Sequence, residues 1–156
     1  PLCKPTMGVL LYLERIIMKY IYLNASFYNK YPQNLYPEIE QKRNRPYAQV
    51  VISINNQLWA IPLRSNIIHN HVLWSNKQNK CGIDLSKAVP ITASDIGNVA
   101  TIRQDEFNRL KGKEYILKSK FERYIVKYKK AKNDLSKRHN QLLVSYSTLQ
   151  YFEQYL

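Results

Sequence analysis

The chain has 156 residues, which is long enough for one domain to bury a core. Its 22% charged and 45% hydrophobic residues exclude an intrinsically disordered chain. The 24 lysines and arginines outnumber 11 acidic residues and give a formal net charge of +13. This excess predicts a polyanionic partner, nucleic acid before an anionic membrane, and the 13 tyrosines favour nucleic acid because aromatic rings stack on unpaired bases.

The first residues and the cysteines indicate where the protein works. We expect residues 1–17 to be an N-terminal extension, with Met18 as the native start, and residues 18–156 to form a single domain. The apolar run at 7–18 is too short and too interrupted to span a bilayer, and no signal-peptide cleavage site follows it. Cys3 and Cys81 lack disulfide-framework or zinc spacing, so we expect free thiols and a cytoplasmic protein.

The first half of the chain predicts short strands. Residues 19–23 read as a strand, and Asn24 or Ser26 caps a short helix that Pro32 ends. Residues 32–46, with three prolines, are expected to be a surface loop. From 47 to 63 apolar residues alternate on both sides of Asn55-Asn56, which predicts a hairpin with a two-residue turn.

The second half changes from strand to helix. Residues 71–74 and 88–91 read as short strands, separated by a polar turn at 75–80 and a second one after Gly82. Helical patterns follow at 102–112, 113–132 and after a cap at Ser147 or Thr148. The order predicts an α+β fold, a compact curved antiparallel sheet or small barrel with helices packed against it and a C-terminal half that is mainly helical.

The helix at 113–132 carries much of the charge. Residues 109–138 hold twelve Lys or Arg against three acidic residues, a local excess of +9. A charged helix is usually a solvated face, and this remains one reading, but so large an excess favours a surface that meets phosphates. The candidate RNA-binding cations are Lys118, Lys120, Arg123, Lys127 and Lys130.

The stretch AIPLRSNIIHNHVLW, residues 60–74, passes from buried strand to polar residues within one position. Arg64 offers a planar fork of donors that matches a phosphate, and as a strand-end side chain we expect it to contribute little to the core. Ser65 and Asn66 add short donors, and His69 and His71 can exchange protons near neutral pH. Metal-free RNA cleavage needs a base, a cation and an acid of this kind, although Arg-Ser-Asn is also a common loop composition.

The histidines allow two other interpretations. His69 and His71 could bind a metal, but no third ligand of matching type is evident, so no metal and no cofactor are expected. His139 reads as a solvated helical residue.

Three blocks, IPLRSNI-x-H, KCGIDLSKAV and IRQDEFNRLKGKEYI, resemble the endoribonuclease toxins of type III toxin–antitoxin systems, the ToxN/AbiQ superfamily, and its CptN/TenpN branch above all. The resemblance spans about residues 18–152. It implies a MazF/Kid-like fold and a metal-independent ribonuclease that leaves 2′,3′-cyclic phosphate ends and serves in phage defence. It also implies an inhibitor that is a small structured RNA, which the toxin cuts from a repeat-bearing precursor and retains in a toxin–RNA hetero-oligomer. Cellular RNA would be the substrate, with no role for a membrane.

The resemblance also assigns residues. It implies a catalytic set of Arg64, Ser65, Asn66, His69 and Lys87, while His71 and Ser86 of the same groove, together with Tyr28, Tyr31 and the helix cations, would hold RNA. In the ToxN branch a lysine occupies the position of Ile67, so Arg64, His69 or Lys87 takes its role here or activity is weak. Asp84 reads as a turn-capping carboxylate. The alternative function is a non-enzymatic RNA- or DNA-binding module. A third possible function is that of a membrane-surface protein, which the narrow apolar stripe on the helix disfavours.

Overall fold

The computed structural model describes residues 18–41 and 46–156, so the expected extension at 1–17 lies outside the described residues. The strands are β1 (Lys19–Leu23), β2 (Gln49–Ile54), β3 (Gln57–Arg64), β4 (Val72–Asn76), β5 (Cys81–Asp84), β6 (Val89–Ile91) and β7 (Ile96–Val99). The helices are α2 (Ala25–Lys30), α3 (Gln104–Leu110), α4 (Glu114–Lys132) and α5 (Arg138–Ser145). Short 3₁₀ segments are η1 (Leu85–Lys87), η2 (Ala93–Asp95), η3 (Thr148–Tyr151) and η4 (Glu153–Tyr155).

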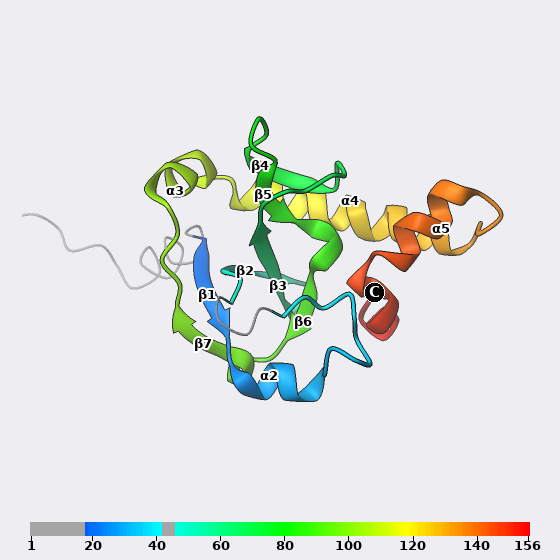
Figure 1. Cartoon of the computed structure of the whole chain (residues 1–156), viewed down its shortest axis with the longest axis horizontal. Coiled ribbons are helices and arrows are strands. Elements are labelled where there is room, and N and C mark those ends of the chain that lie inside the picture. The colour runs from blue at the N-terminus through cyan, green and yellow to red at the C-terminus, as the bar shows by residue number, and fades with distance from the viewer. Residues whose placement is uncertain (1–17, 42–45) are drawn as a thin grey trace, which may run out of the picture.

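The strands form one antiparallel sheet in the order β4-β5-β3-β2-β1-β7, and β6 pairs with β3 beside this path (Figure 1). The predicted hairpin is confirmed, because β2 and β3 pair with Ile52 opposite Trp59. Asn55 and Asn56 have φ values of 49° and 63°, the left-handed geometry that a two-residue hairpin turn requires. Helices dominate after residue 100, so the α+β class and the mainly helical C-terminal half are also confirmed.

The alternating strand pattern sends side chains to two hydrophobic clusters. On β3, Trp59 and Ile61 belong to one cluster, while Ala60 between them belongs to the other. β2 follows the same rule, with Val50 and Ile52 on the side of Trp59. A sheet with apolar residues on both faces needs a cover on both sides, and the helices supply it.

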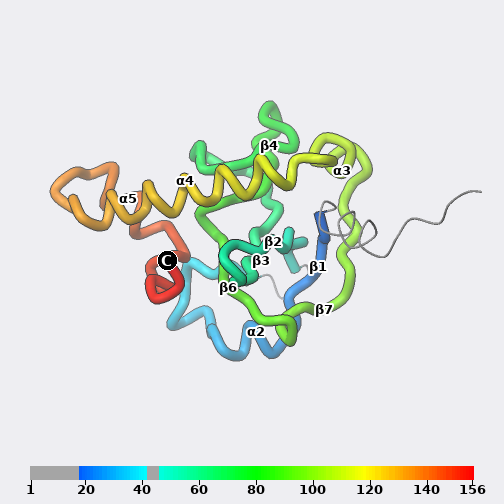
Figure 2. The backbone as a smooth tube through the Cα atoms, turned by 180° about the vertical axis from the view of Figure 1, so that it is seen from behind, coloured from blue at the N-terminus to red at the C-terminus, as the bar shows by residue number. Residues whose placement is uncertain are grey.

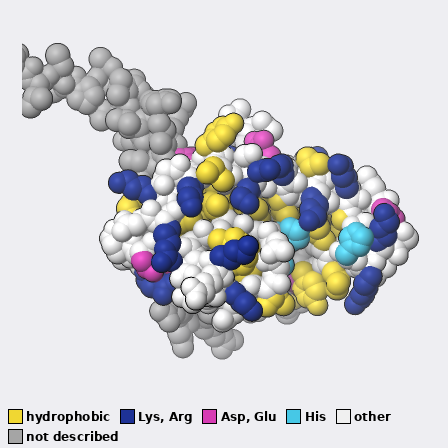
Figure 3. Space-filling view, turned by 90° about the horizontal axis from the view of Figure 1, so that it is seen from above, with side chains coloured by type: hydrophobic (Ala, Val, Ile, Leu, Met, Phe, Trp, Pro, Cys, Tyr) yellow, Lys and Arg dark blue, Asp and Glu magenta, His cyan; other side chains and the backbone are white. Residues whose placement is uncertain are grey.

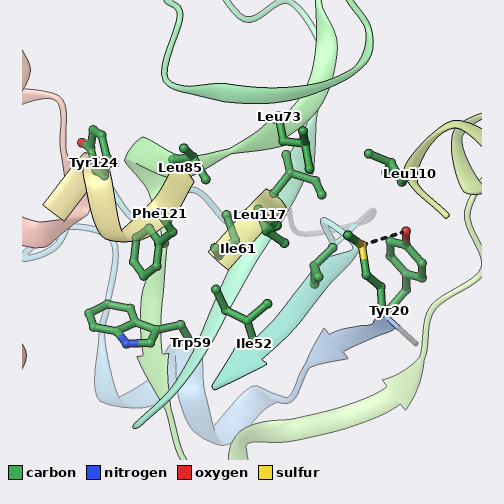
Figure 4. Packing of buried hydrophobic residues seen from close by; sticks show 14 of the residues in the cluster. Tyr20, Ile52, Trp59, Ile61, Leu73, Leu85, Leu110, Leu117, Phe121 and Tyr124 are labelled. Atoms are coloured by element: carbon green, nitrogen blue, oxygen red, sulfur yellow. Dashed lines mark hydrogen bonds between the residues drawn. The ribbon is translucent and has the colours of Figure 1, made fainter. Parts of the chain in front are cut away.

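Helix α4 covers the first face. It lies across the sheet in Figure 2, and its buried stripe includes Leu117, Phe121 and Tyr124, as the sequence predicts. Figure 4 shows this stripe against the strands, and the rings of Trp59 and Phe121 meet edge to face with centroids 5.1 Å apart. Each such fully buried side chain stabilises the fold by about 1.5–3 kcal/mol, so this contact fixes α4 on the sheet.

The second face is covered by α2 and the C-terminal 3₁₀ segments. Phe27 of α2 and Phe152 are fully buried there, and Tyr31 lies between them with ring centroids 5.0 and 5.3 Å away. Tyr28 also packs against Phe27, at 5.4 Å. The two tyrosines that were expected to hold RNA are therefore half-buried parts of an aromatic cluster, and their RNA-binding role stays a prediction.

Three elements were not expected from the sequence: β5, β7 and α5 as a separate helix. β5 is short and contains Gly82, yet it pairs with β3 on one side and β4 on the other. A Cβ at Gly82 would lie 2.5 Å from the Leu73 carbonyl oxygen, so only glycine lets these strands approach this closely. This pairing brings Asp84 and η1 directly beside the end of β3.

Candidate functional site: a histidine-lined cleft around Asp84

The centre of the site is Asp84, a carboxylate with no exposed surface at the end of β5. It caps η1 by accepting the Ser86 backbone N–H at 3.0 Å and the Ser86 hydroxyl at 2.6 Å. Arg64 Nη1 donates to its other oxygen at 2.5 Å, and His69 Nε2 lies 3.2 and 3.3 Å from the two oxygens. The capping role predicted for Asp84 is confirmed, and the carboxylate also brings together Arg64 of β3, His69 of the loop after it and Ser86 of η1.

These contacts decide the charge state of Asp84. Burial raises the pKa of a carboxyl group, but the hydrogen bonds from His69 and Ser86 and the charge of Arg64 outweigh burial and lower the pKa of Asp84 below its ordinary value. Burial likewise works to lower the pKa of Arg64, but Asp84 and Glu40 raise it above its usual value. Asp84 and Arg64 therefore form a charged pair in the folded protein.

Arg64 is held from both ends of its guanidinium. Nη2 donates to Glu40 at 2.7 Å, and Nε is buried without a hydrogen-bond partner among the described residues. The side chain is only 19% exposed. The expectation that Arg64 contributes little to the fold is therefore wrong, because its fork holds two carboxylates instead of facing solvent.

Lys87, at the end of η1, is occupied in a similar way. Its Nζ donates to Glu38 at 2.5 Å and to the Tyr146 carbonyl oxygen at 2.9 Å. Glu38 and Glu40 lie on either side of buried Ile39, in the predicted loop after α2. One acidic segment thus neutralises both cations that the sequence assigned to catalysis.

A cleft of about 670 Å³ opens beside this network. All three histidines of the chain line it: His69 and His71 from the loop between β3 and β4, and His139 from α5. Its other polar lining residues are Glu38, Glu40, Arg64, Ser86, Lys87, Tyr124, Lys127 and Tyr146. His139 is exposed and helical, as the sequence predicts, but no motif indicates that α5 folds back to this cleft.

The histidines differ in how they are held. His69 Nδ1 accepts the His71 backbone N–H at 3.1 Å, which places its proton on Nε2, toward Asp84. The His71 ring stacks on His69 at 5.5 Å and lies 5.2 Å from the Tyr124 ring. Among the described residues, no group hydrogen-bonds to the rings of His71 or His139. Their nitrogens are free for a ligand, whereas His69 is anchored.

His71 lies in an environment that opposes a positive charge. Burial, the nearby charge of Lys127 and His69 lower the pKa of His71 to about 4. The imidazole is therefore neutral at pH 7 and can accept a proton or a hydrogen bond.

Asp84, His69 and Ser86 are the residue types of a hydrolase triad, but their geometry excludes that mechanism. In a triad the serine and the aspartate meet opposite nitrogens of the histidine. Here Ser86 Oγ lies 3.3 Å from the same Nε2 that faces Asp84, and Ser86 donates its hydroxyl proton to Asp84. The serine is thus a ligand of the buried carboxylate and not a nucleophile.

Helix α4 contributes cations that carboxylates do not occupy. Lys120, Arg123 and Lys127 line a second hollow, which shares His71, Tyr124 and Lys127 with the cleft. None of the three has an ion-pair partner in the described parts of the chain. Lys118 precedes Lys127 by nine residues, so it lies roughly 180° around the helix, where it pairs with Glu114. Lys130, one turn beyond Lys127, is exposed.

The remaining residues of the predicted catalytic set do not join the cleft. Ser65 is exposed and lines a different hollow, with Tyr22 and Tyr47. Asn66 is exposed, and its φ of 57° places it at a left-handed turn. Ile67, where the resemblance leads one to expect a lysine, is 3% exposed and belongs to the buried interior. Lys127 is the cation of the cleft that remains open in the described structure.

We predict that Arg64→Ala lowers the free energy of unfolding by about 3 kcal/mol, because it leaves buried Asp84 without its main counter-charge. Urea denaturation followed by circular dichroism measures this change. Arg103→Ala is the control, since Arg103 is 61% exposed and its partners Asp105 and Glu106 both keep contact with solvent, unlike Asp84. Equal stability of the two variants would contradict the structural role of Arg64.

We also predict that the His71 ring titrates with a midpoint near pH 4, followed by NMR of the imidazole Cε1–H. Because the folded pKa lies below the unfolded value of about 6.5, the contribution of His71 to stability is complete above pH 6.5 and is lost as the pH falls toward 4. Lys127→Gln should raise the midpoint, and Lys129→Gln should not. A wild-type midpoint near pH 6.5 would show that the surroundings of His71 do not lower its pKa.

Two further facts about the described residues bear on function. No helix among them is long and apolar enough to cross a membrane, and no group of three or more His, Cys, Asp or Glu side chains is arranged to hold a metal ion. No family model, curated protein or solved structure matches the chain.

Proposed function

We propose that the protein is a metal-independent endoribonuclease toxin of a type III toxin–antitoxin system. It would cleave RNA by attack of a ribose 2′-hydroxyl and leave 2′,3′-cyclic phosphate ends. The observation that carries this proposal is the cleft itself, because all three histidines of a very basic chain converge on one hollow beside the cations of α4.

The groups of the cleft fit the requirements of this reaction. A base must take the proton from the 2′-hydroxyl, and neutral His71 with free ring nitrogens suits that step. An acid must protonate the leaving 5′-oxygen, and His139 is the other histidine whose ring is free in the described structure. Lys127 supplies positive charge for the pentavalent phosphorane. His69 acts as a positioning residue, since its ring accepts the His71 backbone N–H and stacks on the His71 ring.

The balance of charge favours the α4 side as the place where phosphate enters. Beside the cleft, the positive charges of Arg64 and Lys87 are paired with the negative charges of Asp84, Glu40 and Glu38. An entering phosphate therefore meets Lys127 first, with Lys120 and Arg123 in the adjoining hollow. A phosphate there would offset the charge of Lys127 and so raise the pKa of His71, which makes it a better base when substrate is bound.

The resemblance extends the proposal to a partner. A small structured repeat RNA would be processed by the protein and remain bound as its inhibitor. The same open cations suit this role, because phosphate contacts supply most of the affinity of a basic protein for RNA. A non-enzymatic RNA- or DNA-binding module is the alternative, and it would use the same surface without proton transfer.

The experiment that tests the proposal is cleavage of single-stranded RNA in EDTA by protein stripped of bound RNA. We expect cleavage that leaves 2′,3′-cyclic phosphate and 5′-hydroxyl ends, and the cyclic phosphate is detected because it blocks labelling at the 3′ end of the product until it is removed. His71→Gln should slow cleavage by about a hundredfold or more, because it removes the base. Lys129→Gln, a matched change of α4 outside the cleft, should cleave at the wild-type rate. If the stripped protein binds RNA and leaves it intact, the binding-only alternative is correct.

A second prediction separates the two faces of α4. The double variant Lys120→Gln, Lys127→Gln should lower the slope of log affinity against log salt by about 1.4, since each lost phosphate contact on single-stranded RNA removes about 0.7. The double variant Lys118→Gln, Lys129→Gln removes the same charge from the opposite face and should retain the slope. Fluorescence anisotropy at several salt concentrations measures both. Equal slopes for the two variants would show that RNA does not bind preferentially to the face of α4 that carries Lys120 and Lys127.

A further inference from the structure

We infer that the cleft contains a binding site for one unpaired nucleobase, which stacks on Tyr146 beside the phosphate held at Lys127. Ile68, Leu142 and Leu143 complete the apolar wall of this site. The inference rests on the proposed function and deepens it, because it makes single-stranded RNA the substrate class.

The first observation is the exposure of apolar side chains at the cleft. Ile68 is 91% exposed, Tyr146 61% and Leu142 37%, and all three line the same hollow. Single exposed apolar residues are ordinary, but several around one polar cleft indicate a surface that is covered when a ligand binds. Figure 3 shows hydrophobic side chains gathered next to histidine, with Lys and Arg around them.

The second observation is that Tyr146 has a fixed backbone and an unused ring. Its carbonyl oxygen accepts the hydrogen bond from Lys87 at 2.9 Å, and its N–H donates to the Leu142 carbonyl oxygen at 3.1 Å. The next residue, Ser147, is buried and accepts the Tyr124 hydroxyl at 2.8 Å. In the described structure the Tyr146 ring makes no ring contact and its hydroxyl no hydrogen bond. A ring presented in this way is preorganised to stack on a ligand.

The third observation is the mixed chemistry of the cleft lining. Lys127 and His71 suit a phosphate and its ribose, whereas Ile68, Leu142, Leu143 and the Tyr146 ring are apolar. A nucleotide combines an anionic phosphate with a flat apolar face. The base must be unpaired, because bases inside a duplex are stacked on one another and cannot reach a protein ring. A phospholipid also carries a phosphate, but its acyl chains have no flat face to stack on the Tyr146 ring.

The test compares two fluorescein-labelled ten-nucleotide RNAs of equal charge, one an oligouridylate and one abasic throughout, with every 2′-hydroxyl replaced by hydrogen so that neither is cut. Their affinities are measured by anisotropy for the wild type, Tyr146→Ala, Tyr146→Phe and Tyr115→Ala. Tyr115 is 83% exposed in the first turn of α4 and does not line the cleft, so it is a matched control. Circular dichroism of each variant confirms the fold.

We expect Tyr146→Ala to weaken binding of the oligouridylate by about 5- to 150-fold, the range for one base stacked on an aromatic ring, and to leave the abasic RNA unaffected. Tyr146→Phe and Tyr115→Ala should bind both RNAs as the wild type does. The inference is overturned if Tyr146→Ala binds the oligouridylate normally, or if it loses affinity equally for both RNAs. In either case wild-type binding and cleavage leave the proposed function standing. A wild type that binds neither RNA would overturn both.

Discussion

The buried carboxylate of Asp84 is the interaction on which the site depends. A charged group with no exposed surface must be matched by hydrogen bonds and an opposite charge, or the fold loses several kcal/mol. Asp84 satisfies this requirement with Arg64 from β3, His69 from the loop after it, and Ser86 from η1. The same contacts that stabilise the carboxylate therefore fix the loop that carries His71. Stability and the geometry of the cleft have one origin.

This arrangement gives two kinds of cation in one place. Arg64 and Lys87 are held by carboxylates and shape the walls of the cleft. Lys127 has no such partner in the described structure, and together with Lys120 and Arg123 it presents open positive charge. Such a division suits the proposed ribonuclease, since the paired cations would order the protein before substrate arrives and the unpaired ones would attract the phosphate. Because Arg64 is paired with carboxylates, the proposed catalytic groups are the histidines and Lys127 of α4 instead of Arg64.

Local sequence patterns predicted much of the fold. The alternation from Ala48 to Leu63 and the Asn55-Asn56 turn specify the hairpin, and the apolar stripe of α4 specifies which side packs on it. β5 and β7 were missed because each has four residues without a clear alternation, and they are stabilised by pairing with strands distant in sequence. A register of this kind is set by tertiary contacts, which short-range patterns do not encode.

The same limit applies to the candidate site. His69 and His71 were found because they follow a strand, and Lys87 through the family resemblance, but whether these residues face one another depends on the β3–β5 pairing. His139 and Tyr146 could not be found at all, since their place depends on how α5 folds back along α4 (Figure 1). Tyr28 and Tyr31 show the opposite case, in which a composition typical of RNA binding belongs to an aromatic cluster.

The central claim is that RNA binds in the cleft that the histidines line. Since His69, His71 and His139 are the only histidines of the chain, their imidazole NMR signals report on this cleft alone. The direct measurement is a titration of the protein with a single-stranded RNA in which every 2′-hydroxyl is replaced by hydrogen, so that it binds without being cut. We expect the His71 and His139 signals to shift with bound RNA and the pKa of His71 to rise. Saturation by this RNA with all three histidine signals unmoved would contradict the account.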